Sequence, residues 1–107
     1  MDERQFETLA TQTLHRIERA LDESGIDADI ELKEGGVLEL EFANGSKIIV
    51  NRHGAAREIW VAARSGGFHF RYDGAKWVDT RDATELFVKL SRLCSAQSGT
   101  PVILAPG

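Results

Sequence analysis

The sequence predicts an α+β fold, in which an N-terminal and a C-terminal helix pack on one face of an antiparallel sheet of about five to six strands. Three observations predict this two-layer sandwich. A helical apolar pattern opens the chain, a second one closes it, and apolar and polar residues alternate with period two between them. The links between the alternating segments are too short for the helical crossovers of parallel strands. Because the chain has 107 residues and no internal repeat, we expect one domain over residues 1–107.

The first expected helix covers residues 3 to 23. Its apolar residues recur at the i, i+3, i+4, i+7 spacing of a single helix face; they are Phe6, Leu9, Ala10, Thr13, Ile17, Ala20 and Leu21. Asp2 and Gln5 stand at the spacing of a capping box before this pattern, and Ser24-Gly25 predicts the end of the helix.

Alternating segments follow, separated by glycine turns. The expected strands are 27–33, 37–43, 46–52, the two segments of 57–70 on either side of Gly66-Gly67, and 76–79. Asn44-Gly45 is the strongest hairpin signal. In the fourth strand, Ile59 and Val61 alternate with Trp60. Because the aliphatic side is the core, Trp60 is expected on the outer, solvated face of the sheet.

The second expected helix runs from about Asp82 to Gln97, with Asp82 and Glu85 at capping-box spacing. Its apolar stripe consists of Leu86, Phe87, Leu90, Leu93 and Cys94. The segment Val102 to Leu104 follows this helix, and we expect it to pack between the two helices.

Charge and composition exclude several classes of protein. The net charge of −4 argues against a nucleic-acid partner, and no apolar run approaches the roughly 18 residues of a membrane helix. A single cysteine excludes an internal disulfide framework, and the acidic start of the chain is not a secretory signal. We therefore expect a cytoplasmic protein with no membrane partner, and the charged surface predicts a monomer.

The acids are concentrated at one end of the sequence. Residues 1–34 hold ten acidic and four basic side chains, whereas residues 35–107 hold seven and nine. On the first helix, Glu3, Glu7, Glu18 and Asp22 fall within one arc, although Arg16 and Arg19 interleave the acids. Such an edge favours cations or a basic partner, and its alternative interpretation is an ordinary solvated face.

The acidic arc continues from the helix end into the first strand. Asp27, Asp29 and Glu31 alternate there, about 7 Å apart in an extended strand. This spacing is too wide for two carboxylates to chelate one ion tightly, and it favours loose, water-mediated binding of divalent cations.

Trp60 admits two interpretations: a satisfied aromatic side chain covered by its neighbours, or an anchor for a protein partner. His15, His53 and His69 show no metal-ligand spacing, and His53 is expected in a loop. No nucleophile, phosphate-loop or zinc motif is present, so the sequence predicts no enzyme with its own catalytic constellation.

The stretches NGSKIIVNRH (44–53) and EIWVAARSGGFHF (58–70), after an acidic helix and the pattern Asp27-x-Asp29-x-Glu31, resemble the frataxin family in its bacterial, CyaY-type form. The resemblance covers residues 3 to about 97. It implies the sandwich described above, weak binding of Fe2+ or Fe3+ by an acidic ridge, and a role in iron–sulfur cluster assembly through contacts with the cysteine desulfurase and the scaffold protein.

The resemblance also implies which residues act. The metal-binding acidic ridge would comprise Glu18, Asp22, Glu23, Asp27, Asp29 and Glu31, with Glu3 and Glu7 as possible additions. Partner binding would use Asn51 and Trp60 together with Glu18 and Asp22.

The expected function is that of a non-enzymatic protein that regulates cluster assembly or supplies iron to it. A metal-independent electrostatic adaptor remains an alternative. An iron-storage or ferroxidase-like protein is disfavoured, because it needs two irons held close together by facing elements.

Overall fold

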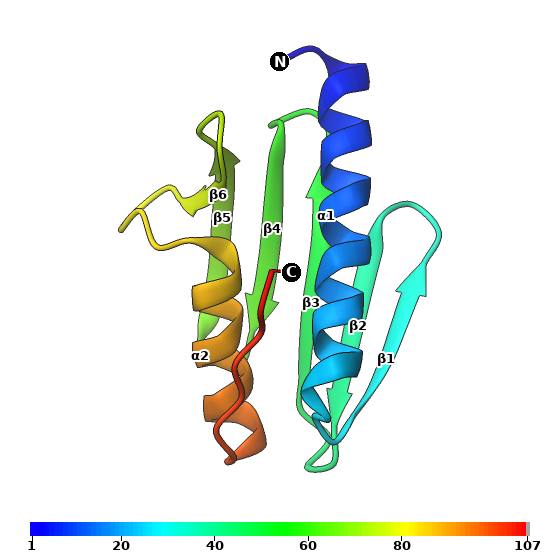
Figure 1. The fold of residues 1–107 in the computed structure, drawn as a ribbon, viewed down its shortest axis with the longest axis vertical. Coiled ribbons are helices and arrows are strands. Elements are labelled where there is room, and N and C mark those ends of the chain that lie inside the picture. Colours follow the sequence, from blue (N-terminus) through cyan, green and yellow to red (C-terminus); the bar gives the residue numbers. More distant parts are fainter. Residues whose placement is uncertain (107) are drawn as a thin grey trace.

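The computed structural model describes residues 1–106. Two helices, α1 (Glu3–Ser24) and α2 (Leu86–Ser98), flank six strands along the chain: β1 (Ala28–Lys33), β2 (Val37–Phe42), β3 (Lys47–His53), β4 (Glu58–Ala63), β5 (Gly66–Tyr72) and β6 (Trp77–Asp79). The strands form one antiparallel sheet in chain order. Both helices cover the same face of it (Figure 1), which confirms the predicted α+β sandwich. Within this part of the chain, no helix is long and apolar enough to cross a membrane.

α1 begins and ends within one residue of the prediction. The Gln5 backbone N–H donates to the Asp2 carboxylate at 2.8 Å, and the Asp2 backbone N–H donates to the Gln5 side chain at 3.0 Å. This capping box satisfies donors that the first helical turn would otherwise leave unpaired. Gly25 ends the helix in the left-handed conformation, at φ 72°.

The second helix begins later than predicted. Its N-cap is Glu85, whose carboxylate accepts two backbone N–H groups of the first turn of α2. The Asp82 carboxylate instead accepts the Thr84 N–H at 2.9 Å, within a turn that contains Ala83 at φ 62°. An α-helix cannot contain that backbone conformation. The prediction that the helix starts at Asp82 with a capping box is therefore wrong.

The core lies between the helices and the inner face of the sheet. The fully buried residues of β2 to β5 follow the predicted alternation: Leu38, Leu40, Ile48, Val50, Ile59, Val61 and Phe70. Trp77 of β6 reaches α1, where its indole N–H donates to Thr13 Oγ1 at 3.0 Å. Trp60 lies on the opposite, outer face, as predicted.

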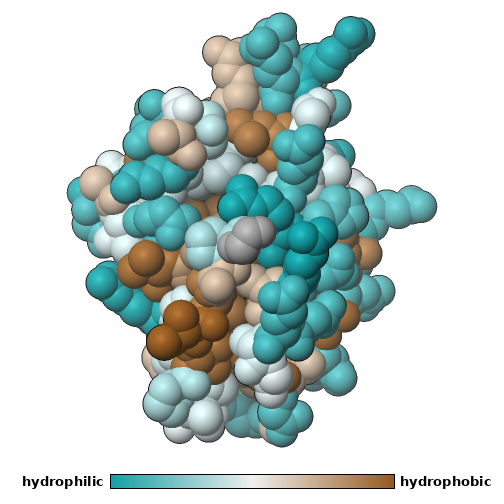
Figure 2. Space-filling view, viewed as in Figure 1, coloured by the Kyte–Doolittle hydropathy of each residue, from teal (hydrophilic) through white to brown (hydrophobic). Residues whose placement is uncertain are grey.

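The C-terminal tail runs beside α2 toward α1 (Figure 1). Leu104 is buried in the core and Val102 is half-buried, whereas Ile103 is 85% exposed. Hydrophobic side chains reach the surface where α2 and the tail lie (Figure 2). Ser91 and Ser95 of α2 hydrogen-bond to the tail backbone. The tail thus packs between the helices through two of its three apolar residues, and the expectation is wrong for Ile103.

Candidate functional site

The acidic ridge occupies one edge of the molecule. α1 leads through Gly25 into β1, the outermost strand on that side, so the helical and strand members of the ridge follow one another (Figure 1). Glu18 is half-buried, and the other seven ridge carboxylates, Glu3 and Glu7 included, are exposed. Along β1, Asp29 and Glu31 face solvent while Ile30 and Leu32 turn toward the core.

The ridge carboxylates have almost no fixed partners. Glu18 lies 3.8 Å from His15, and the other seven form no ion pair within residues 1–106. Arg16, which interleaves these acids in the sequence, turns to the C-terminal tail. Its guanidinium donates to the Pro106 carbonyl at 2.7 and 3.1 Å and lies 5.7 Å from the centre of the Phe87 ring. The ridge therefore keeps a negative charge that Arg16 does not neutralise by contact.

One arginine divides the ridge. Arg52, at the end of β3, donates from Nη1 to Thr11 Oγ1 at 2.8 Å. Thr11 follows Glu7 by about one helical turn and precedes Glu18 by about two. Gly36 leaves room for this arginine, because a Cβ there would lie 2.7 Å from its side chain. A positive charge thus separates Glu3 and Glu7 from the rest of the ridge, and the sequence pattern did not predict it.

β2 adds two carboxylates beside β1. Glu41 lies directly opposite Asp29 in the β1–β2 register. Glu39, on the same strand, is bound by Lys33 at 2.9 Å and by Lys47 at 3.2 Å. These hydrogen bonds hold the pKa of Glu39 below its usual value. Glu41 forms no ion pair in the described part of the chain, so it extends the unneutralised charge.

Asp27, Asp29 and Glu41 line a shallow hollow of about 280 Å³. The Gly35-Gly36 turn sets the β1–β2 register that places Glu41 opposite Asp29. This turn is therefore the feature of the sequence from which the contribution of β2 could have been predicted. Across residues 1–106, no three His, Cys, Asp or Glu side chains converge closely enough to hold a metal ion. Carboxylates spread in this way can attract a divalent cation and bind it through its water shell.

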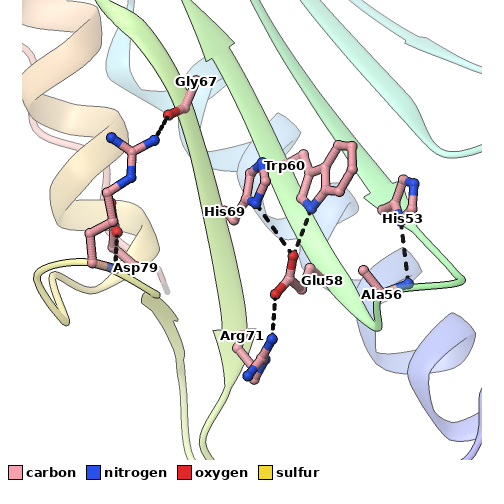
Figure 3. A network of polar contacts seen from close by, with 9 residues as sticks. His53, Ala56, Glu58, Trp60, Gly67, His69, Arg71 and Asp79 are labelled. Atoms are coloured by element: carbon pink, nitrogen blue, oxygen red, sulfur yellow. Dashed lines mark hydrogen bonds and ion pairs between the residues drawn. The ribbon is translucent and has the colours of Figure 1, made fainter.

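Trp60 lies inside a stack of three aromatic rings on the outer face of the sheet (Figure 3). The imidazole of His53 covers one face of the indole, with ring centres 3.8 Å apart and planes 10° apart. The imidazole of His69 covers the other face, at 4.4 Å and 8°. The indole is therefore half-buried, with both faces covered. His53 lies at the end of β3 rather than in the expected loop, and strand pairing is the only feature of the sequence that could have indicated this stack.

Glu58 holds the stack through its carboxylate. Its carboxylate accepts the Trp60 indole N–H at 2.9 Å and the Arg71 guanidinium at 2.7 Å, and His69 Nδ1 lies 3.6 Å away (Figure 3). Glu58 is buried. Burial alone would raise its pKa, but the hydrogen bonds from Trp60 and Arg71 outweigh burial and hold the pKa of Glu58 below its usual value.

Asn51 lies directly opposite Trp60 across the β3–β4 pair. Strand β4 is three strands away from β1, which corresponds to about 14 Å across the sheet. A typical interface covers about 800 Å² on each partner. One protein partner is therefore large enough to contact the ridge and the Trp60 surface together.

Cys94 is fully buried on the core side of α2. Burial raises the pKa of its thiol to about 12, so the thiolate needed for nucleophilic attack is disfavoured. This agrees with its place in the predicted apolar stripe.

Residues 1–100 match the family model of the frataxin-like domain. The "Iron-sulfur cluster assembly protein CyaY" of Dechloromonas aromatica is 61% identical over 104 residues, covering 97% of this chain and 99% of that protein. The protein of the same name from Cupriavidus taiwanensis is 52% identical over 102 residues, covering 92% of each chain.

Solved structures show the same fold. Frataxin from Psychromonas ingrahamii superposes with a TM-score of 0.89 at 35% identity, over 98% of this chain and 99% of that one. A trimeric yeast frataxin, described as complexed with ferrous iron, gives a TM-score of 0.72 at 25% identity, over 85% and 86% of the two chains. The family model, the high identity over nearly full length and the shared fold lead to one conclusion: this chain belongs to the frataxin-like family.

Proposed function

We propose that this protein binds iron weakly along its acidic ridge and acts in iron–sulfur cluster assembly, either as a regulator or as an iron supplier. The observation that carries this proposal is the edge of exposed carboxylates without fixed partners. The relatives named as iron–sulfur cluster assembly proteins give that edge its context.

The ridge suits iron as a cargo rather than as a resident cofactor. Carboxylate oxygens are suitable ligands for Fe2+ and Fe3+, which would be held by Glu18, Asp22, Glu23, Asp27, Asp29 and Glu31. Because the groups are exposed and spread along an edge, bound iron keeps water ligands and exchanges readily. Glu3 and Glu7, beyond Arg52, would contribute least.

The same negative field would guide a basic surface of the cysteine desulfurase onto the ridge, with Glu18 and Asp22 in the contact. Electrostatic attraction of this kind accelerates association and weakens with salt. The neighbouring sheet face, with Asn51 and Trp60, would form a second contact with the desulfurase–scaffold complex. We place this activity in the cytoplasm and assign it to the monomer.

A metal-independent adaptor is the second candidate. One observation favours it: within the described residues, no three carboxylates lie close enough together to hold a metal ion. The same dispersion argues against a ferroxidase-like enzyme, which needs two irons held close together.

A titration with Fe(II) under anaerobic conditions, followed by NMR, tests the proposal. The expected result is selective broadening of amide signals from Glu18 to Glu31, while Glu58 and Trp60 stay sharp. Two variants are compared in this titration. Asp29→Asn removes one exposed acid within the ridge, and the matched control Glu34→Gln removes one exposed acid outside it. If Fe(II) leaves the ridge signals unchanged while the desulfurase still shifts them, iron binding is refuted and the adaptor is correct.

A further inference from the structure

The two histidines that cover Trp60 are held in different ways. His53 Nδ1 accepts the backbone N–H of Ala56 at 3.3 Å, in the turn that follows β3 (Figure 3). His69 Nδ1 instead faces the carboxylate of Glu58. One ring is thus fixed by acting as an acceptor, and the other lies beside an anion.

A proton has opposite consequences for these two contacts. The nitrogen of His53 that accepts the Ala56 N–H must be unprotonated, so the proton of the neutral ring is on Nε2. An imidazolium carries a hydrogen on both nitrogens, and two N–H donors cannot face each other at 3.3 Å. Protonated His53 therefore loses the contact that holds its ring in place on Trp60. Protonated His69 gains an ion pair with Glu58 and stays in place.

Within residues 1–106, no carboxylate contact holds protonated His53 in place. Glu58, opposite it on β4, directs its carboxylate to Trp60, Arg71 and His69. Arg57, in the turn beside it, donates to the Gly54 carbonyl. The charged groups that face the stack from β4, β5 and the turn are thus Glu58, His69, Arg71 and Arg57, and no contact within residues 1–106 pairs an acid with His53.

The geometry points to His53 as a proton-controlled cover of Trp60: the neutral ring closes one face of the indole, and protonation uncovers that face for the proposed desulfurase–scaffold partner. This inference rests on the proposed partner role of Trp60. It makes the availability of that surface depend on pH.

Collisional quenching of Trp60 fluorescence by acrylamide, measured from lifetimes on the full chain, tests this inference. Trp77 is only 4% exposed and serves as the shielded internal reference. Between about pH 7.5 and about pH 5.5, where histidine changes charge, the quenching rate constant of Trp60 should rise about twofold. The rise should follow the titration of His53 seen by NMR.

Three variants make the test specific. His53→Phe keeps a ring on the indole that cannot titrate, and quenching should stay low at both pH values. His53→Ala should give high quenching at both, with the amide spectrum checking that the fold is intact. His69→Phe should keep the pH-dependent rise. An unchanged rate constant in the parent chain, or an equal rise in His53→Phe, would overturn the inference. Because no partner or iron is present, either result leaves the proposed function to its own test.

Discussion

The acidic ridge and the Trp60 surface hold their polar groups in opposite ways. The ridge exposes carboxylates whose charges have almost no fixed partner. In the Trp60 surface, the indole N–H, the buried carboxylate of Glu58 and the guanidinium of Arg71 are joined in one network. Unpaired charges of like sign repel each other and remain available to a ligand, whereas a satisfied network adds stability and order.

This difference separates binding from stability. Changes in the ridge should alter binding and leave the fold unaffected. Changes in the hydrogen-bond network of Glu58, Trp60 and Arg71 should lower the stability of the fold more than they alter partner binding.

Glu58→Ala should have the largest effect on stability, a loss of about 2–3 kcal/mol in the free energy of unfolding. The indole N–H of Trp60 and the guanidinium of Arg71 would lose a charged acceptor. Urea unfolding of the two proteins measures the loss. Glu58→Gln keeps one acceptor and should lose less. A loss below about 0.5 kcal/mol for the alanine variant would show that the network does not stabilise the sheet.

Neutralising the ridge should have the opposite outcome. A variant with Asp22→Asn, Asp27→Asn, Asp29→Asn and Glu31→Gln should unfold within about 0.5 kcal/mol of the parent, because exposed charges contribute little to stability. Its Fe(II)-induced broadening should disappear. Normal broadening in this variant would exclude these four residues as the iron site, and a large loss of stability would contradict the separation of roles.

The sequence predicts most of this fold because strand and helix periodicities differ and the turns are clearly marked. It predicts the ridge because exposed acids at regular spacing are visible without tertiary contacts. It does not predict Arg52 on Thr11 or His53 on Trp60, because both depend on where strand ends meet other elements. The start of α2 is not predicted correctly because Asp82 and Glu85 stand at capping-box spacing, whereas the Asp82 carboxylate in fact accepts the Thr84 N–H two residues on and Glu85 is the N-cap.

Arg52→Gln sharpens the boundary of the ridge. Glutamine can still donate to Thr11 but carries no charge, so the stability loss should be about 0.5–1 kcal/mol. Fe(II) broadening should now reach Glu7, since the separating positive charge is gone. Arg52→Lys keeps the charge and should confine the broadening as in the parent chain. Identical broadening in all three proteins would mean that Arg52 does not divide the ridge.

A smaller effect concerns acid unfolding. Lys89 lies 3.1 Å from the buried Asp79 and 2.9 Å from Asp82. A backbone hydrogen bond from Thr84 and the bond from Lys89 lower the pKa of Asp82 to about 2. A carboxyl whose pKa is lowered by folding stabilises the fold above its unfolded-state pKa of about 4, and that stability is lost as the pH falls. Lys89→Met should therefore move the acid-unfolding midpoint to higher pH, as circular dichroism can show; an unmoved midpoint would argue against this contribution.

Calorimetry of binding to the cysteine desulfurase, at low and high salt and with or without Fe(II), tests the role of the ridge most directly. The parent chain should bind at low salt, weaken on the order of tenfold at high salt, and respond to iron; the fourfold ridge variant should lose both dependences. Binding that is equally tight in both proteins and insensitive to salt would contradict the assignment of the ridge as the docking and iron-binding edge.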